Sequence, residues 1–513
     1  MYPIDFFYRA AERHPERVAL DGPAGQVRYA RLAADVRALA AALQDLDPEP
    51  QSRVAICAGN SAEHVLAFLA VLASGKIWVP LNYRSTVSEL GRILDATTPS
   101  IVMADALGQP LLPPEGGHRV VLDAGATGAP ASASVPSPGA SALPDLLARF
   151  EGRTPLRHTL PRDAIQAIKF TGGTTGLPKG VMQPYRAWNT GIMNQIATWS
   201  LTPDDRYVVA APITHGTGTY VVPVLAQGGS LLLLDGAGPA AVTEAFRERG
   251  GTLSFMPPTL IYMIMAQPGV SRADFPRLRN LIYGGAPMPV EKIDRARAFF
   301  GPVLGTTYGQ TEAPQIVTAL RPAELEIDAW RGSVGRLTWL SEVAILGPDG
   351  AELPRGEIGE VAVRGDLVMT GYWRLPEKTA ETLVDGWLRT GDTGLLDASG
   401  YLFLKDRLRD VIITGGFNVY PVDVENALSS HPAVYECSVF GLPDDKWGEA
   451  VHAAVQFLPE ARADAESLKA HVRALLGPVA TPKHIHVHES LPRSSVGKVL
   501  KNAVRDAARE ETS

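Results

Sequence analysis

The sequence predicts an α/β protein: a large N-terminal domain of helix-flanked sheets with a small β-barrel region, followed by a small α+β domain. Three observations lead to this fold class. A chain of 513 residues exceeds what one hydrophobic core usually holds, so two or more domains are expected. Strand and helix signals alternate through the N-terminal half, which is typical of parallel sheets covered by helices. The pattern changes near residue 334 and again near residue 405.

The alternation in the N-terminal half is clearest in two segments. In the first, the turn Gly59-Asn60-Ser61 supplies a helix cap after a buried strand. The expected elements are strand Arg53–Cys57, helix 62–73, strand Ile77–Leu81, strand 230–234, helix 240–249 and strand Leu253–Met256. A strand, a helix and a further strand form the unit from which parallel sheets are built.

Two changes of pattern divide the rest of the chain. Between residues 334 and 364, short strands are broken by turn sequences that end at Gly350 and Gly356, which predicts an antiparallel β region. After Lys405 the expected elements are helix 422–428, strands 435–440 and 451–457, helix 466–475, strand 484–487 and helix 498–508. We therefore expect one domain over residues 1–405 and a second over 406–513.

The composition narrows the class of protein. A hydrophobic content of 45% suits a soluble globular chain. A net charge of −7 without a dense basic run argues against nucleic acid or an anionic membrane as partner. The apolar run at residues 65–73 is too short to cross a bilayer, and the first ten residues lack signal-peptide features. Cys57 and Cys437 lie in apolar contexts and are expected as buried thiols. These features predict a cytoplasmic enzyme and are compatible with a homodimer.

The most informative segment is the loop Thr171-Gly-Gly-Thr-Thr-Gly-Leu-Pro-Lys-Gly180. Its glycines let backbone N–H groups turn toward an anion, its threonines add hydroxyl donors, and Lys179 adds positive charge. It is not a Walker A loop, because Pro178 stands before the lysine and Gly180 after it. The loop by itself predicts a polyphosphate site, and a flexible glycine-rich surface loop remains the alternative.

Four further motifs follow this loop: Tyr308-Gly-Gln-Thr-Glu312, Thr390-Gly-Asp392, Asp406-Arg-Leu-Arg-Asp410 running into Gly415-Gly-Phe-Asn-Val-Tyr-Pro421, and Pro492-Arg-Ser-Ser-Val-Gly-Lys498. In this order the five motifs resemble the signature of the AMP-forming adenylate synthetases, in particular the acyl-CoA synthetase (fatty-acid–CoA ligase) branch. The resemblance covers nearly the whole chain. It implies an N-terminal domain that binds ATP and an acid, a small mobile C-terminal lid, and the use of ATP, Mg²⁺ and coenzyme A.

The resemblance assigns an ATP site residue by residue. The phosphates would be held by Thr171, Gly172, Gly173, Thr174, Thr175, Gly176 and Lys179. Gly172 departs from the serine usual in this loop, which implies weaker ATP contact or a more mobile loop. The nucleoside would be held by Gly284, Gly285, Ala286, Tyr308, Gly309, Asp392 and Arg407. Among these, Tyr308 would stack on adenine, and Asp392 with Arg407 would bind the ribose.

The resemblance also assigns the reacting groups. Glu312 would hold Mg²⁺, Thr311 would contact the α-phosphate, and Lys498 would bridge the carboxylate and the α-phosphate in the transition state.

Two further assignments concern the lid and the acyl site. Arg409 would act as the hinge, although Asp or Lys is commoner there, and Gly415 and Gly416 would border the pantetheine tunnel. His215 falls where this branch carries a residue that gates the acyl site, while a histidine hydrogen-bonded only within its own loop remains the alternative.

The expected substrate is an apolar carboxylic acid, fatty or alicyclic. Tyr308-Gly-Gln310 lacks the tryptophan of the acetate-using branch, and Gly216, Gly218 and Gly305 would leave room for a chain or ring. The partners are then the small-molecule acid and coenzyme A. Three rivals stay open: a stand-alone enzyme that loads a carrier protein, a luciferase-like oxidoreductase on the same fold, and a non-catalytic nucleotide-binding protein.

Overall fold

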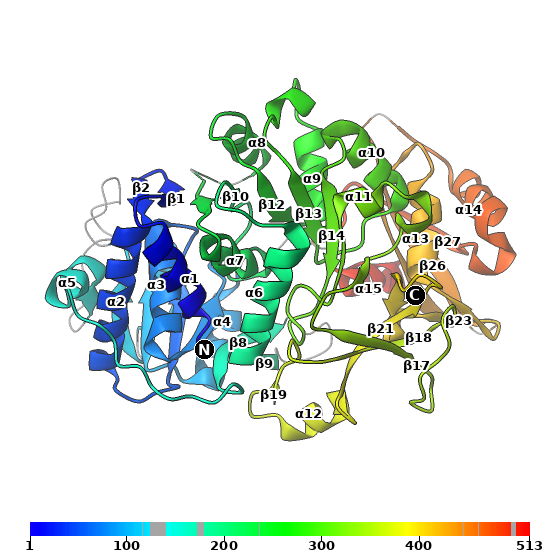
Figure 1. Cartoon of the computed structure of the whole chain (residues 1–513). Helices are drawn as coiled ribbons and strands as arrows, with labels where there is room; N and C mark the ends of the chain where they lie inside the picture. The colour runs from blue at the N-terminus through cyan, green and yellow to red at the C-terminus, as the bar shows by residue number, and fades with distance from the viewer. Residues whose placement is uncertain are drawn as a thin grey trace.

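The structure, a computed structural model of the chain, describes residues 1–114, 116–123, 140–171, 179–234, 236, 238–444, 446–459, 461–493 and 499–512. The chain folds into two large, mostly parallel sheets, a small antiparallel sheet and a C-terminal α+β unit (Figure 1). The predicted α/β fold class is confirmed.

The first sheet runs in the order β19-β9-β8-β4-β3-β5-β6-β7. Its strands are β3 (Arg53–Cys57), β4 (Ile77–Leu81), β5 (Ile101–Ala104), β6 (His118–Val121), β7 (Ser141–Ala142), β8 (Ile165–Thr171), β9 (Lys179–Pro184) and β19 (Gly371–Tyr372). Strands β3 to β8 are parallel, whereas β9 and β19 are antiparallel at one edge. The predicted strands at β3 and β4 are confirmed, as is the cap at Ser61, whose Oγ accepts from the His64 backbone N–H at 3.1 Å.

The second sheet runs in the order β16-β15-β14-β13-β12-β10-β11-β1-β2. Its strands are β1 (Val18–Gly22), β2 (Gly25–Arg28), β10 (Arg206–Val208), β11 (Ser230–Leu232), β12 (Leu253–Met256), β13 (Asn280–Gly284), β14 (Leu304–Tyr308), β15 (Thr318–Leu320) and β16 (Arg336–Leu337). The predicted strand at β12 is confirmed, whereas β11 ends two residues before the predicted bound.

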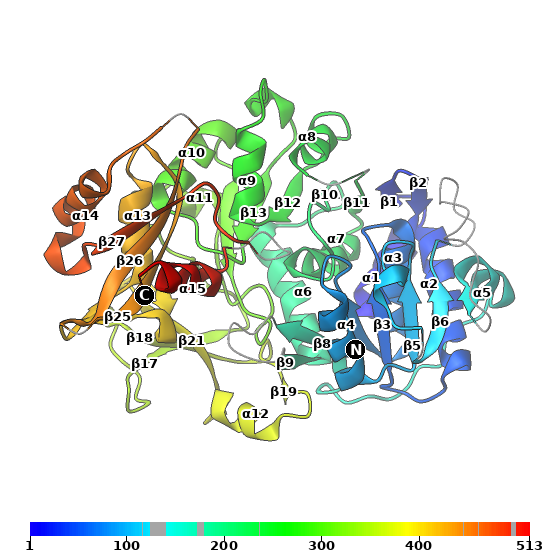
Figure 2. The ribbon, with the colours of Figure 1, turned by 180° about the vertical axis from the view of Figure 1, so that it is seen from behind.

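Helices cover both sheets. They are α1 (Ile4–Arg13), α2 (Tyr29–Leu46), α3 (Ala62–Ser74), α4 (Val87–Thr97), α5 (Leu143–Arg149), α6 (Tyr185–Trp199), α7 (Val221–Ala226), α8 (Pro239–Arg247), α9 (Pro258–Met265), α10 (Val290–Phe300), α11 (Pro322–Leu325) and α12 (Pro376–Thr382). The largest buried core joins α1, α2, α3, α6 and α7 to strands of both sheets, so these helices form the layer between the sheets. Helices α8, α9 and α10 pack on the other face of the second sheet (Figure 2).

The third sheet is antiparallel, as predicted for this region. It contains β17 (Glu342–Leu346), β18 (Gly359–Arg364), β20 (Leu383–Val384), β21 (Trp387–Leu396) and β22 (Leu402–Arg407). A buried carboxylate, Glu324, connects it to the second sheet. Glu324 accepts hydrogen bonds from Arg321 Nε at 2.9 Å, Arg336 NH2 at 2.9 Å and Tyr401 Oη at 3.1 Å.

This connection predicts a pH-dependent contribution to stability. Burial acts to raise the pKa of Glu324, but the hydrogen bonds from Arg321 and Arg336 outweigh it and bring the pKa to about 2. Because the folded pKa lies below the ordinary value, the contribution is present above about 4.5 and is lost as the pH falls toward about 2. We expect Glu324→Gln to lower the free energy of unfolding by about 1–3 kcal/mol at neutral pH. Urea unfolding at several pH values measures this difference.

The control is Glu342→Gln, which removes an exposed ion pair with Arg364. It should change the free energy of unfolding by less than about 1 kcal/mol. Equal losses in the two variants at neutral pH would contradict the assignment of Glu324.

The C-terminal unit is α+β, as predicted. It contains β23 (Ile412–Thr414), β24 (Phe417–Val419), α13 (Pro421–Ser429), β25 (Val434–Asp444), β26 (Gly448–Phe457), α14 (Ala465–Ala480), β27 (His484–His488) and α15 (Lys501–Thr512). The predicted start of the last helix at Lys498 is wrong. Arg493 and Val499 form an antiparallel bridge, and the Leu500 N–H donates to the Pro492 carbonyl at 2.8 Å, so the helix begins only at Lys501.

Across the described ranges, no helix combines the length and the apolar character needed to span a membrane.

Candidate active site

The candidate site lies where the two large sheets present the carboxyl ends of their parallel strands, the usual place for ligands in α/β proteins. Strands β4 and β8 end there from the first sheet, and β13 and β14 from the second. Three contacts cross between the two sides. Asn60 Nδ2 donates to the Ala211 carbonyl at 2.9 Å, Gln183 Nε2 donates to the Thr311 carbonyl at 2.8 Å, and Asn82 Nδ2 lies 3.0 Å from His215 Nε2.

A buried carboxylate, Asp392 on β21, collects three partners at this crevice. Its Oδ2 accepts from Tyr308 Oη at 2.6 Å and from Gln310 Nε2 at 2.5 Å. Its Oδ1 pairs with Arg407 Nε of the neighbouring strand β22 at 2.8 Å. Burial and the adjacent carboxylate of Asp392 raise the pKa of Tyr308 well above its ordinary value, so the phenol remains a donor. The structure therefore brings Tyr308, Gln310 and Arg407 together around Asp392.

A second carboxylate, Glu312, lies in the loop that follows β14. Its Oε1 accepts from Tyr372 Oη at 2.8 Å, and its backbone carbonyl accepts from the Met369 N–H at 2.7 Å. Lys179 Nζ lies 5.1 Å from the centre of the Tyr372 ring. Mg²⁺ is commonly held by one or two carboxylates together with phosphate oxygens and water, so the donor set at Glu312 fits that ion.

The first residue of the predicted phosphate loop, Thr171, ends β8 and pairs in register with Lys179, which begins β9. The segment between them, with Gly172, Gly173, Thr174, Thr175 and Gly176, lies outside the described residues, so its role stays a prediction. Lys498 also lies outside the described residues.

His215 is exposed and begins the turn into the short helix η2 (Gly216–Tyr220). Its contact with Asn82 is made to a residue at the carboxyl end of β4 and not to its own loop. An amide that donates to Nε2 favours the neutral ring with its proton on Nδ1. His215 is therefore not held by its own loop alone, because its ring contacts Asn82 on the other side of the crevice.

The glycines of the site are explained by close packing. A Cβ on Gly309 would lie 2.6 Å from the carbonyl carbon of Gln315, and one on Gly284 would lie 2.9 Å from the Phe255 ring. Gly285 has φ +77° and leads into Ala286, so the chain turns sharply after β13. Gly309 and Gly284 therefore allow neighbouring parts of the protein to pack closely at the site.

The sequence-based expectation that Gly216, Gly218 and Gly305 leave room for an acyl chain is wrong. A Cβ on Gly218 would lie 1.7 Å from the Ile213 carbonyl oxygen, and one on Gly305 would lie 2.9 Å from Trp199. A Cβ on Gly216 would lie 2.7 Å from the Phe255 ring. The protein itself occupies these spaces, because a missing side chain lets neighbouring groups pack closer instead of leaving a void.

The predicted hinge and tunnel residues lie at the start of the C-terminal unit. Arg409 lies in the short helix η5 (Leu408–Asp410), between the end of β22 and the start of β23. Gly415 and Gly416 form the turn between β23 and β24, with φ of +58° and +82°. Phe417 beside them is 62% exposed, so this turn lies at the surface.

A different surface of the C-terminal unit rests on the N-terminal domain. Lys292 Nζ of α10 lies 6.0 Å from the ring centre of Tyr262 in α9 and 5.9 Å from that of Tyr435 in β25. Next to Tyr435, Glu436 forms an ion pair with Arg493. Arg493 is bridged to Val499, and these two residues flank the part of the chain that contains Lys498.

Sequence reasoning missed several residues that hold this site. Tyr372, Asn82 and Gln183 give no local signal, because each contacts a residue more than 50 positions away. Gln310 lies inside the Tyr308–Glu312 motif, and its amide next to a predicted ribose carboxylate could have been noticed.

Comparison with known proteins agrees with this geometry. Residues 7–373 match the family model of the AMP-binding enzyme, and residues 423–498 match that of the AMP-binding enzyme C-terminal domain. The chain is 35% identical over 503 residues to a feruloyl-CoA synthase of Amycolatopsis sp., with 97% of each chain covered. It is 31% identical over 510 residues to the fatty acid–[acyl-carrier-protein] ligase ScoC of Streptomyces coeruleorubidus, covering 97% of this chain and 94% of that one.

Among solved structures, the amide bond synthetase McbA from Marinactinospora thermotolerans superposes with a TM-score of 0.88. It is 34% identical in sequence, and the match covers 99% of this chain and 100% of McbA. The resemblance expected from the five motifs is thereby confirmed, and the chain belongs to the AMP-binding enzyme family, the adenylate-forming superfamily that includes the acyl-CoA synthetases.

Proposed function

We propose that this protein is an AMP-forming acyl-CoA synthetase that activates a carboxylic acid with an apolar fatty or alicyclic body and transfers it to coenzyme A. The observation that carries the proposal is the convergence of three features on one crevice. These are the buried carboxylate of Asp392, the carboxylate of Glu312 and the strand end at Thr171 that leads into the glycine-rich loop.

The first half-reaction makes the acid reactive. A carboxylate oxygen of the acid attacks the α-phosphorus of ATP, the bond from this phosphorus to the bridging oxygen breaks, and pyrophosphate leaves with the electron pair. Lys498 would neutralise the charge that builds up between the carboxylate and the α-phosphate. Glu312 would hold Mg²⁺, which when bound neutralises phosphate charge.

Asp392 would bind the ribose. A carboxylate offers about four acceptor positions, so its three partners Tyr308, Gln310 and Arg407 leave about one for a ribose hydroxyl. Arg407 and Gln310 hold the carboxylate from two sides, which fixes its orientation before the nucleotide arrives.

In the second half-reaction the thiol sulfur of coenzyme A attacks the acyl carbon, the bond from this carbon to the AMP oxygen breaks, and the thiol proton is released. The turn at Gly415 and Gly416 faces solvent in this structure. Rotation of the C-terminal unit about Arg409 would bring this turn to the crevice and withdraw Lys498, so that one lid would serve the two steps in succession.

The test is pyrophosphate release with ATP and Mg²⁺ across a panel of acids, with and without coenzyme A. Turnover that requires coenzyme A and peaks on one acid class is the expected result. A single burst of acyl-AMP that coenzyme A does not discharge, but that a carrier protein or an amine does, would replace the proposal with one of the activities named for ScoC and McbA. The absence of pyrophosphate release with any acid would refute it.

A further inference from the structure

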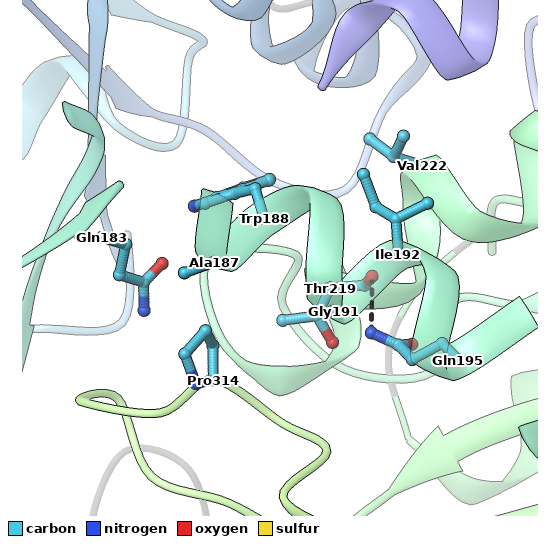
Figure 3. Close-up of a pocket in the computed structure, with 9 residues that line it drawn as sticks. All are labelled: Gln183, Ala187, Trp188, Gly191, Ile192, Gln195, Thr219, Val222 and Pro314. Carbon is cyan, nitrogen blue, oxygen red and sulfur yellow. Dashed lines mark hydrogen bonds between the residues drawn. The ribbon is translucent and has the colours of Figure 1, made fainter. Parts of the chain in front are cut away.

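A small pocket beside α6 is too narrow to select the acid. Side chains from β9, α6 and the loop after β14 line it, among them Gln183, Trp188, Gln195 and Pro314 (Figure 3). Its free space of about 20 Å³ holds about one water molecule and no acyl chain. The order of the two half-reactions depends instead on the junction between the third sheet and the C-terminal unit.

A cluster of three charged side chains forms part of this junction. Lys501, the first residue of α15, has its Nζ 3.3 Å from Glu425 Oε1 of α13 and 3.7 Å from Asp406 Oδ2 of β22. The side chains of Lys501, Glu425 and Asp406 are 28%, 16% and 10% exposed, so water and salt screen these contacts less than they screen a surface pair. Lys405 of β22 and Asp423 of α13 form a second ion pair across the same junction, at 3.2 Å.

Asp406 is held on the third sheet, whereas its partners belong to the C-terminal unit. Its backbone N–H donates to Thr393 Oγ1 at 3.2 Å, and this hydroxyl donates to the Asp406 carbonyl at 2.9 Å. Its Oδ1 accepts from the next backbone N–H at 2.7 Å, while Oδ2 faces Lys501. Asp406 precedes the predicted hinge Arg409, and Glu425 and Lys501 follow it. Rotation about Arg409 would therefore move Glu425 and Lys501 together and separate both from Asp406.

The charge balance of the cluster depends on Lys501. Burial raises the pKa of Asp406 to about 6; Lys501 of α15 acts to lower it, and the carboxylates of Glu425 on α13 and Asp410 on η5 act to raise it. Above about pH 6, Asp406 is ionised and attracts Lys501, whereas below this pH it is neutral and the attraction is lost. Without Lys501, the carboxylates of Asp406 and Glu425 would face each other across the junction with no cation between them.

We propose that Lys501 is a positioning residue for the first half-reaction, because its contact with Asp406 holds the C-terminal unit in the observed orientation. The turn at Gly415 and Gly416 lies at the surface in this orientation, so the second half-reaction, which would need this turn at the crevice, requires the contact to break. Lys501 also follows Lys498 by three residues and anchors the chain just after it. This inference rests on the proposed function and adds a residue that selects between its two steps.

The experiment measures the two half-reactions separately in wild-type protein, Lys501→Met and Lys501→Arg. The first rate is pyrophosphate release with the acid that reacts fastest in the panel above, and the second is thioester formation from its acyl-AMP and coenzyme A. Lys501→Met should lower the ratio of the first rate to the second about tenfold, because two carboxylates then repel each other across the junction. Lys501→Arg keeps the charge and should retain most of the ratio. An unchanged ratio in Lys501→Met would overturn the proposal.

Two further variants separate positioning from a merely structural role. The double variant Lys501→Met/Asp406→Asn removes the repulsion and should recover part of the ratio lost in Lys501→Met. Glu425→Gln keeps an acceptor for the Val439 N–H at 2.9 Å but removes the charge that competes for Lys501, so its ratio should stay at or above that of the wild type. Equal loss of both half-reactions in every variant of the cluster would contradict the proposal.

The pH profile gives a readout that a packing role would not change. In wild-type protein the ratio should fall as the pH drops through about 6, because Asp406 becomes neutral and releases Lys501. Asp406→Asn should have a lower ratio at pH values well above 6 and should lack this fall. Effects of pH on ATP and coenzyme A are common to both proteins, so the difference between the two profiles reports on Asp406. Identical profiles would count against the proposal.

A last measurement needs no turnover. Trypsin cleavage after Arg409, whose side chain is 51% exposed, is followed by mass spectrometry in the whole protein. Lys501→Met should be cut about tenfold faster than Lys501→Arg, because cleavage tracks the population in which the junction is open. Equal cleavage rates would overturn the proposal. Failure of the proposed function is recognised separately, since it abolishes pyrophosphate release with every acid while trypsin still reports on the junction.

Discussion

Replacing Lys498 with alanine is expected to reduce acid-dependent pyrophosphate release at least about 100-fold, while largely sparing thioester formation from supplied acyl-AMP. The reason is that the ammonium group would stabilise charge only while the carboxylate attacks the α-phosphorus. Arg493, the last described residue before the segment that contains Lys498, connects to a strand that contacts the N-terminal domain. Arg493 is paired with Glu436, which follows Tyr435, and Tyr435 contacts Lys292 of the N-terminal domain.

Two assays measure the two half-reactions separately: pyrophosphate release from ATP and acid, and thioester formation from acyl-AMP and coenzyme A. Lys469→Ala is the matched control, because Lys469 lies on α14 of the same unit and pairs only with Glu466 on its own helix among the contacts described. It should leave both rates near those of the wild type. Equal loss of both half-reactions in Lys498→Ala would reject a lysine that serves one step only.

Replacing Glu312 with glutamine is expected to lower Mg²⁺-dependent pyrophosphate release by about 100- to 1000-fold. A metal clamp contributes several kcal/mol to the transition state, and each 1.36 kcal/mol corresponds to about tenfold in rate. The substitution keeps the size of the side chain and its acceptor for Tyr372, so the packing at 2.8 Å can persist. The Mg²⁺ concentration needed for half-maximal rate should rise in parallel.

Tyr372→Phe provides the graded comparison for Glu312. It removes the hydrogen bond to Oε1 but leaves the negative charge, so we expect a loss of about 10- to 100-fold, as for partners that orient a metal ligand. Titrations of activity against Mg²⁺ for the two variants measure the difference. A Glu312→Gln protein with the metal dependence of the wild type would show that another group holds the ion.

Much of the fold could be predicted from local pattern. Strands β3 and β4 match their predicted bounds because buried parallel strands are short, continuous apolar runs that end at turn residues. The cap at Ser61 could also be predicted, because it depends only on the backbone N–H of a residue three positions away. Prediction failed at the last helix, because a bridge between Arg493 and Val499 precedes it and the helix begins only at Lys501.

Individual site residues show the same difference between what the sequence predicts and what it misses. The motifs around Thr171, Tyr308, Asp392 and Lys498 determined the family, because phosphate and nucleotide chemistry requires particular residue types at short spacing. The three glycines expected to open an acyl pocket were misread, since a sequence does not reveal which neighbour fills the space beside a glycine.

What the sequence by itself determined is therefore the fold class, the family and the residue types that a nucleotide site requires. Only the tertiary structure decided how these residues are held. Tyr372 hydrogen-bonds Glu312, Tyr308 and Gln310 hydrogen-bond Asp392, and Lys169 lies between two tryptophan rings. The physical reason is that periodicity along a chain records whether a side chain is buried, whereas the chemistry of a buried polar group depends on partners that the fold brings from distant positions.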